Sequence, residues 1–231
     1  MATLFRNAPL LAPQQPRLPS APQEYGPQFQ DQYSAVLRLY FNQLQNFTQL
    51  IASEAGGGLI GFPFIAAIDS ATQYATANDT PTVVEWTSAD AINAFTLNAN
   101  NTATALYSGI YKITYSAQFK NDATDSHEAI VWLRVNGDTS AADVPSSATI
   151  FSLPARKGVG RPSYVCGYSE VVFALNAGDS VGLWWGTDQA ATSGGTLGVS
   201  IFSQAAQTTP MPYPATPSVI GSITLVSALF T

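Results

Sequence analysis

The chain has 231 residues, of which 46% are apolar and only 10% are charged, and its net charge is −6. Soluble domains usually carry about 25% charged residues, so disorder driven by high charge is excluded for most of the chain. An acidic chain with nine Lys and Arg residues offers no broad positive surface, and we therefore expect no nucleic-acid partner.

The chain has one cysteine, Cys166, and one histidine, His127. These counts exclude an internal disulfide, a cysteine-rich zinc site and a multi-histidine metal centre, and we expect no cofactor. We expect Cys166 to be a small buried apolar residue, because free cysteine is among the most buried residue types. Residues 1–11 lack the apolar segment of a signal peptide, and no apolar run reaches the roughly 20 residues that span a bilayer, so no membrane insertion is expected.

Residues 1–24 are predicted to form an extended, proline-rich anchoring arm. Each proline fixes its own φ and disfavours a helical conformation in the residue before it, so no core can form here. Apolar side chains on such a stiffened strand can fill pockets on a partner, which favours a strap over a ligand for an SH3-type domain. The prolines are Pro9, Pro13, Pro16, Pro19 and Pro22, and the candidate anchor residues are Leu4, Phe5, Leu10, Leu11 and Leu18.

Residues 25–61 are predicted to hold one long helix, from Pro27 to residue 55, and a glycine-rich linker. Proline is tolerated at the first helical position, and the three glycines 56–58 end the helix. Six apolar residues follow a heptad spacing, which indicates either a helix that packs on its own domain or a short self-associating coiled coil. Aromatic residues in this seam favour a wider bundle than a dimer. The seam residues are Tyr33, Leu37, Tyr40, Leu44, Phe47 and Ile51.

Residues 62–231 are predicted to form a mainly β domain, an antiparallel sandwich or jelly roll of at least eight strands. Short runs rich in Val, Ile, Thr, Tyr and Phe alternate with turn clusters there. The clearest strand is 110–120, in which apolar and polar residues alternate strictly. The other expected strands are 64–68, 82–86, 104–106, 129–135, 165–175, a strand through Val181, Leu183 and Trp185, 197–203 and 219–229.

Three segments resemble, in order and spacing, the C1q/TNF-like jelly roll: 109–119 (GIYKITYSAQF), 131–137 (VWLRVNG) and 172–183 (VFALNAGDSVGL). Three further segments resemble structural proteins of bacteriophages, especially cyanobacterial and marine phages: 18–25 (LPSAPQEY), 37–41 (LRLYF) and 217–220 (PSVI). The resemblance implies a homotrimeric virion surface protein, either a fibre or a capsid decoration. The short region before the jelly roll favours a compact trimer over a long fibre.

The sequence offers little catalytic chemistry. His127 follows Asp125 and Ser126 directly, and in an extended chain such neighbours point to alternate faces, so no triad is expected. The loop 156–161 holds three basic residues and is expected to be a solvated hairpin, the alternative being a contact with an acidic partner or lipopolysaccharide. The carboxylates are expected to be solvated turn and edge residues, with Asp179 ordering a turn; they are Asp69, Glu85, Asp90, Glu128, Glu170, Asp179 and Asp188.

Several large apolar residues fall on the outward positions of the predicted strands. One such residue needs no explanation, but several on one chain indicate a second buried surface. A C1q-like trimer supplies that surface at its threefold axis, and a carbohydrate-binding platform of Trp and Tyr is the competing interpretation. The residues are Ile130, Trp132, Tyr164, Tyr168, Trp184 and Phe202.

The sequence therefore favours a non-enzymatic, homotrimeric virion structural protein, made in the host cytoplasm and attached to the virion surface through its N-terminal region. The expected partners are further copies of the chain and another virion protein, either the major capsid protein or a tail adaptor or nozzle. The first alternative is a short tail fibre whose jelly-roll tip binds host-surface glycan. The second alternative, a carbohydrate-active enzyme, lacks a recognisable catalytic constellation.

Overall fold

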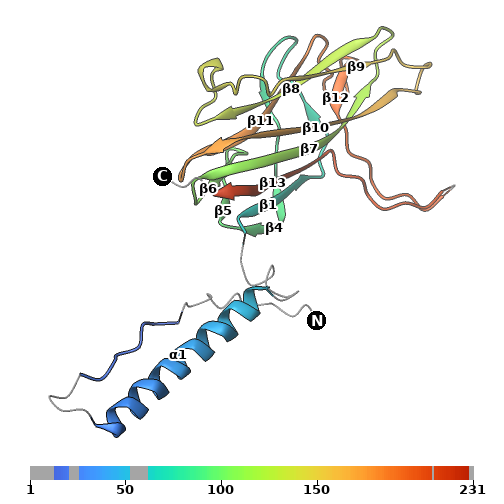
Figure 1. The fold of residues 1–231 in the computed structure, drawn as a ribbon. Coiled ribbons are helices and arrows are strands. Elements are labelled where there is room, and N and C mark those ends of the chain that lie inside the picture. Colours follow the sequence, from blue (N-terminus) through green and yellow to red (C-terminus); the bar gives the residue numbers. More distant parts are fainter. Residues whose placement is uncertain (1–12, 21–25, 53–61, 210, 229–231) are drawn as a thin grey trace. The chain divides into compact units, whose positions relative to one another are not determined.

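The computed structural model describes residues 13–20, 26–52, 62–209 and 211–228, apart from the side chains of 50–52 and 228. The chain divides into two compact units, residues 1–61 and 62–231 (Figure 1). No helix among the described residues is both long and apolar enough to cross a membrane.

The first unit contains one α-helix, α1 (Pro27–Ala52), which begins at the proline that the sequence indicated. The Gly26 carbonyl accepts the Phe29 N–H at 3.1 Å and so satisfies one of the free donors of the first turn. Residues 13–20 contain neither helix nor strand, and their half-buried positions are Pro13, Pro16 and Pro19, the three-residue repeat of polyproline II. The rest of the predicted arm and the glycine-rich linker lie outside the described residues.

The second unit is a sandwich of two antiparallel sheets, which confirms the predicted fold class of a mainly β jelly roll preceded by one long helix. Sheet A contains β1 (Phe64–Asp69), β2 (Gln73–Tyr74), β4 (Ser88–Asn93), β7 (Gly109–Asn121), β10 (Ser163–Leu175), β12 (Val199–Ile201) and β13 (Val219–Ala228). Sheet B contains β3 (Thr82–Val83), β5 (Phe95–Leu97), β6 (Ala103–Ala105), β8 (His127–Val135), β9 (Thr149–Leu153) and β11 (Ser180–Thr187). A short 3-10 helix, η1 (Ser140–Ala142), follows β8.

Strand β7 is the centre of sheet A. β10 pairs with it along its full length, from Gly109 opposite Leu175 to Asn121 opposite Ser163. β13 and β12 share its other edge, and the sheet continues from β13 to β1 and β4. In sheet B, β11 pairs with β8 on one side and with β3 and β6 on the other. The two strands of greatest interest for the site, β8 and β10, therefore belong to different sheets.

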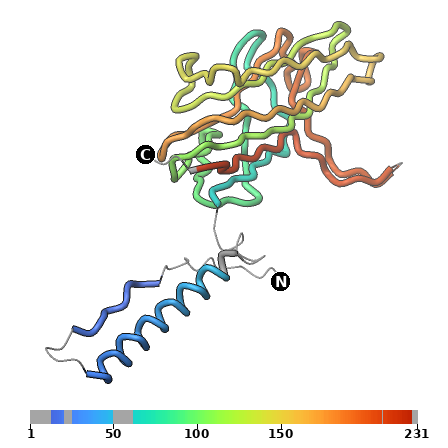
Figure 2. Tube along the Cα trace, viewed as in Figure 1, coloured from blue at the N-terminus to red at the C-terminus, as the bar shows by residue number. Residues whose placement is uncertain are grey.

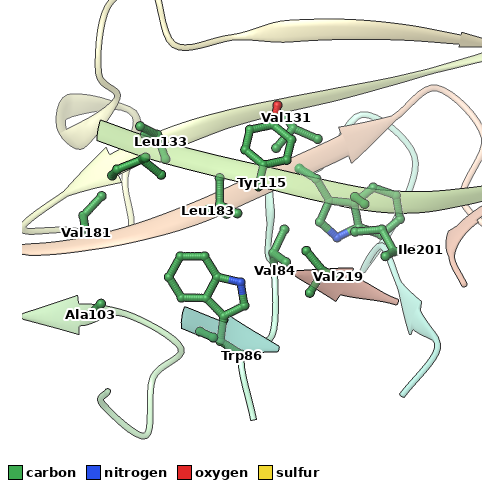
Figure 3. Close-up of a cluster of buried hydrophobic side chains, with 14 of the residues drawn as sticks. Val84, Trp86, Ala103, Tyr115, Val131, Leu133, Val181, Leu183, Ile201 and Val219 are labelled. Atoms are coloured by element: carbon green, nitrogen blue, oxygen red, sulfur yellow. The ribbon is translucent and has the colours of Figure 1, made fainter. Parts of the chain in front are cut away.

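The core lies between the inner faces of the sheets (Figure 3). The strict alternation expected for 110–120 is confirmed, because odd-numbered residues of β7 are buried and even-numbered ones are not. Val84 and Trp86 are buried in the same core, and they belong to the segment that follows the two-residue strand β3. Burying each such side chain contributes about 1.5–3 kcal/mol, so these core side chains supply most of the free energy that favours folding.

One predicted surface carboxylate, Asp69, is instead buried, with 1% of its area exposed. Its oxygens accept hydrogen bonds from Thr87 Oγ1 (2.8 Å), Gln73 Nε2 (2.9 Å) and Ser218 Oγ (3.1 Å). These donors come from three separate segments, so the carboxylate joins the end of β1 to the segments before β4 and β13. The expectation of a solvated residue was wrong because a charged group can be buried once hydrogen bonds satisfy it.

The segment between β12 and β13 forms a two-stranded ribbon that extends beyond the sheets (Figure 2). Gln204 pairs with Thr216 and Gln207 with Tyr213 through reciprocal backbone hydrogen bonds of 2.8–3.1 Å. None of residues 203–217 is charged.

Candidate functional site on the outer faces of the sheets

The outer face of sheet A carries exposed apolar side chains on β10, β13 and β1, on both sides of the mostly polar outer residues of β7. Tyr168 of β10, Ser116 of β7, Ile220 of β13 and Ile68 of β1 lie opposite one another in a row. Val172, Lys112, Thr224 and Phe64 form a parallel row on the same face. Tyr168 is 60% exposed, Val172 53% and Ile220 49%. The exposed apolar side chains therefore form two groups, Tyr168 and Val172 on β10 and Ile220 and Phe64 on β13 and β1, with polar residues of β7 between them.

The strip between these two rows consists of Glu170, Thr114, Ser222 and Ala66. Thr114 and Ser222 hydrogen-bond across β7 and β13 at 2.6 Å. Lys112 and Glu170 pair at 3.5 Å at the β10 side. Thr114, Ser222 and Ala66 have small side chains, so another flat surface can approach the part of the face formed by β7, β13 and β1.

Cys166 also lies on this outer face, between Tyr164 and Tyr168 on β10, and its thiol is exposed. Its Sγ is 3.2 Å from Ser116 Oγ on β7. The expectation of a buried cysteine was wrong because even-numbered residues of β10 point outward, a parity that Cys166 shares with Tyr164 and Tyr168. Tyr164 packs against Phe202, with ring centroids 5.5 Å apart.

The outer face of sheet B is built around Arg134, which lies between two tryptophans. Trp132 of β8 lies directly opposite Trp184 of β11. The Arg134 guanidinium lies 4.1 Å from the Trp184 ring centroid and 5.6 Å from that of Trp132, and the residue is only 4% exposed. Cation–π attraction of this kind is strongest where the cation has lost water.

The partly exposed Asp143 holds Arg134 and Trp132 in place through hydrogen bonds. Its Oδ1 accepts hydrogen bonds from Arg134 Nε at 2.6 Å and from Trp132 Nε1 at 2.7 Å. Arg134 also donates to the Asp138 carbonyl. The hydrogen bond from Arg134 holds the pKa of Asp143 below its ordinary value; slight desolvation opposes this shift and Trp132 adds to it. The Trp132 ring is therefore held in one orientation.

A hollow of about 240 Å³ adjoins Trp132, and we call it the Trp132 hollow. His127 Nδ1 lies 3.0 Å from Asp188 Oδ2 at its edge, and the Glu128 N–H donates to Asp188 Oδ1 at 3.0 Å. Burial raises the pKa of Asp188, but the hydrogen bonds from His127, the Glu128 N–H and Thr187 outweigh it, so the pKa lies below its ordinary value. The lining residues are Asp79, Pro81, Glu128, Ile130, Trp132, Gly186, Thr187 and Asp188.

A second hollow of about 630 Å³ adjoins Trp184 on the same face. Its lining is mostly amide and hydroxyl groups. Trp184 Nε1 is buried and has no hydrogen-bond partner within the described part of the chain, which is an unusual state for an indole N–H. The lining residues are Val83, Asn100, Asn101, Thr102, Asn136, Gly137, Asp138, Ser180 and Trp184.

The six outward residues expected at one interface are thus divided between two faces. Tyr164, Tyr168 and Phe202 belong to sheet A, whereas Ile130, Trp132 and Trp184 belong to sheet B. Strand alternation told us which side chains point outward, but the sheet to which each strand belongs depends on pairing that alternation does not encode. The six do not form one continuous surface on a single chain.

The predicted helix seam has no buried member among the residues whose side chains are described. Leu44 is 37% exposed, and the apolar neighbours Leu39 and Phe41 are 61% and 58% exposed. Tyr33, Leu37, Tyr40 and Phe47 are half-buried. Ile51 belongs to α1, but its side chain is not described. Of the candidate anchors, Leu18 is 47% exposed, and Leu4, Phe5, Leu10 and Leu11 lie outside the described residues.

The remaining chemical expectations concern His127, Asp179 and the basic loop. The His127 side chain is mostly covered, and its Nδ1 lies within hydrogen-bonding distance of the Asp188 carboxylate. Asp179 does order its turn, accepting hydrogen bonds from the Asn176 N–H at 2.7 Å and Asn136 Nδ2 at 2.6 Å. The loop 156–161 is a tight hairpin, closed by Lys157 N–H to Arg161 O at 2.9 Å. Among the described residues, no group of three or more His, Cys, Asp or Glu side chains could hold a metal ion.

No protein-family model matches the chain, and no curated protein matches it. Among solved structures, the globular domain of the zebrafish complement 1qA protein aligns with 73% of this chain and 100% of its own length. The identity of that alignment is 11% and its TM-score is 0.40. The two-sheet sandwich is established by the strand pairing of this chain and not by that alignment.

Proposed function

We propose that this chain is a non-enzymatic structural protein of a bacteriophage virion, which assembles as a homotrimer and attaches to the particle surface through its N-terminal region. The observation that carries the proposal is the exposed apolar face of sheet A. Several large apolar side chains exposed on one face, here Tyr168, Val172 and Ile220, mark an interaction site.

The occupant we assign to the sheet A face is a second copy of the chain. The rows through Tyr168 and Val172 combine apolar area with a flat, hydrogen-bonded strip between them, which suits packing of one folded domain on another. In a cyclic trimer, the sheet A face of each copy packs on a different surface of the next copy. Three such contacts close the ring, so the sheet A face of every copy is covered.

The helix supports the same assembly. Leu39, Phe41 and Leu44 leave apolar area on α1 open to solvent in a single chain. A helix with apolar residues on more than one side is favoured inside a bundle, where neighbouring copies cover them. Aromatic residues in the seam favour three or more helices over two.

The particle attachment rests on the arm and on the resemblance of segments 18–25, 37–41 and 217–220 to phage structural proteins. The arm carries apolar side chains on a proline-stiffened strand, and Leu18 is open to solvent in the described part. Three arms on one trimer bind a particle multivalently, which strengthens a weak individual contact. The partner is the major capsid protein or a tail adaptor or nozzle.

Two measurements test the proposal. Sedimentation of the full chain is expected to give roughly three times the 24.4 kDa of the monomer. A chain that starts near Gln28 is expected to stay trimeric but to fail to load onto particles that lack the native protein. A stable monomer at micromolar concentration contradicts the trimer, and normal loading of the shortened chain contradicts the anchor. The copy number on the particle then separates a capsid decoration from a fibre.

A further inference from the structure

The Trp132 hollow on sheet B has a rigid aromatic wall. Asp143 holds the Trp132 indole through a hydrogen bond of 2.7 Å, and the nearly buried Arg134 lies behind the ring. The Trp132 side chain lines the hollow together with Ile130 and Pro81. A flat apolar wall that is already held in place costs little conformational entropy when a ligand packs on it.

The space in front of this wall exists because residue 186 is glycine. A Cβ at Gly186 would lie 3.9 Å from two ring carbons of Trp132 and 3.7 Å from the Thr80 carbonyl oxygen, which are ordinary contact distances. A larger side chain would therefore fit the fold and would fill the hollow. Strand β11 keeps a residue without a side chain at the point where a ligand would rest.

The rim of the hollow supplies hydrogen-bond acceptors without a cation. Asp188 is occupied by His127 and by the Glu128 N–H. In the described part of the chain, the carboxylate oxygens of Asp79 and Glu128 accept no hydrogen bond and form no ion pair, and no Lys or Arg lines the hollow. Charged acceptors form hydrogen bonds about twice as strong as neutral ones.

These features fit one class of ligand. A hexopyranose ring has a face of C–H groups that packs on an aromatic plane and a rim of hydroxyls that donate to carboxylates. A quaternary ammonium group, by contrast, is recognised by several aromatic walls arranged as a cage, and only Trp132 among the lining residues is aromatic. We propose that the Trp132 hollow binds a sugar ring of a carbohydrate, with Trp132 as the stacking surface and Glu128 and Asp79 as hydroxyl acceptors.

The second hollow extends this site along the same face. Trp184 lies opposite Trp132 on the neighbouring strand and lines the larger hollow. Amide and hydroxyl side chains there, such as Asn101 and Asn136, both donate and accept. A carbohydrate of more than one ring can therefore occupy both hollows and exchange hydrogen bonds with these amide and hydroxyl groups.

The test uses the full chain and titrates the indole N–H signals of its tryptophans by NMR. The probes are the methyl glycosides of glucose, galactose, mannose and N-acetylglucosamine at millimolar concentrations, with tetramethylammonium chloride as the cation probe. At least one glycoside is expected to shift the Trp132 signal saturably. A shift with tetramethylammonium alone, or no shift with any glycoside, overturns the proposal.

Two variants separate the site from general damage. Gly186→Val fills the hollow and is expected to weaken the glycoside response by at least about tenfold. Gly158→Val adds the same atoms in open space on the basic hairpin and is expected to leave the response unchanged. Equal binding by both variants contradicts the assigned position. Both variants are expected to stay trimeric, so loss of sugar binding is distinguishable from loss of assembly.

Discussion

Replacing Tyr168 by serine tests the assignment of the sheet A face as the contact between copies. Tyr168 is 60% exposed in the single chain and lies in the middle of β10, opposite Ser116. Its ring rests on the sheet without being part of the core. The substitution is therefore expected to weaken assembly while leaving the sandwich folded.

The magnitude follows from the exposed area. An aromatic side chain buries about 150–250 Å² in cores and interfaces, so covering three-fifths of that removes about 90–150 Å² from water. At about 25 cal/mol per Å² this is about 2–4 kcal/mol for each protomer. A trimer contains three such contacts, and the concentration at which half the chains are assembled is expected to rise at least about a hundredfold.

The assay is sedimentation over a concentration series, with circular dichroism as the check on folding. Tyr107→Ser is the matched control, because Tyr107 is 56% exposed but lies in the loop between β6 and β7. Its carbonyl, which accepts the Tyr111 hydroxyl at 2.8 Å, survives the change. An assembly midpoint that moves no further for Tyr168→Ser than for Tyr107→Ser would refute the assignment of sheet A.

Three further outcomes are expected. Cys166, exposed in the single chain, should react slowly with iodoacetamide in the assembled native protein and quickly once assembly is lost; equal rates count against burial of sheet A. Asp143→Asn keeps an acceptor oxygen but removes the charge beside buried Arg134, and should cost about 1–3 kcal/mol in urea unfolding at neutral pH. Because the pKa of Asp143 is lowered in the folded state, its carboxylate stabilises the fold above the unfolded-state pKa and loses this effect as the pH falls through the folded-state pKa, so the difference between native and variant should vanish in acid. Gly221→Ala would bring a Cβ to 2.8 Å from Trp86 Cζ2 and should lower stability by about 1–3 kcal/mol in thermal unfolding, unlike the same change at a glycine in open space.

The sequence was most informative for strands in which one face is buried along the whole length of the strand. Strand β7 alternates over thirteen residues, and the periodicity predicted both its extent and its inward side chains. The strands β2, β4, β5 and β9 were missed. β4, for example, reads SADAIN and is largely exposed, so it carries no apolar alternation to detect. Its place in the sheet is set by hydrogen bonds to β1 rather than by its own side chains.

The candidate sites were predictable in part. Alternation identified Trp132 and Tyr168 as outward residues, and the exposure of Cys166 was implied by the same parity on β10. The grouping of these residues was not predictable, because the pairing of β8 with β11 and of β10 with β7 joins segments far apart in sequence. The Trp132 hollow depends on Gly186, whose missing side chain becomes meaningful only once the Trp132 ring is seen beside it.

The position of β13 has a consequence for the order in which this chain folds. β13 lies between β7 and β1, and it follows every other strand of the sandwich in sequence. During synthesis, β1 can pair with β4 early, but its second neighbour, β13, is made only when nearly the whole domain has been synthesised, and such long-range pairing is slow. Helix α1 is complete long before that point. In the homotrimer that we propose, the helices of nascent chains on one messenger would be free to associate while sheet A is still incomplete, so the copies would assemble before their β domains close.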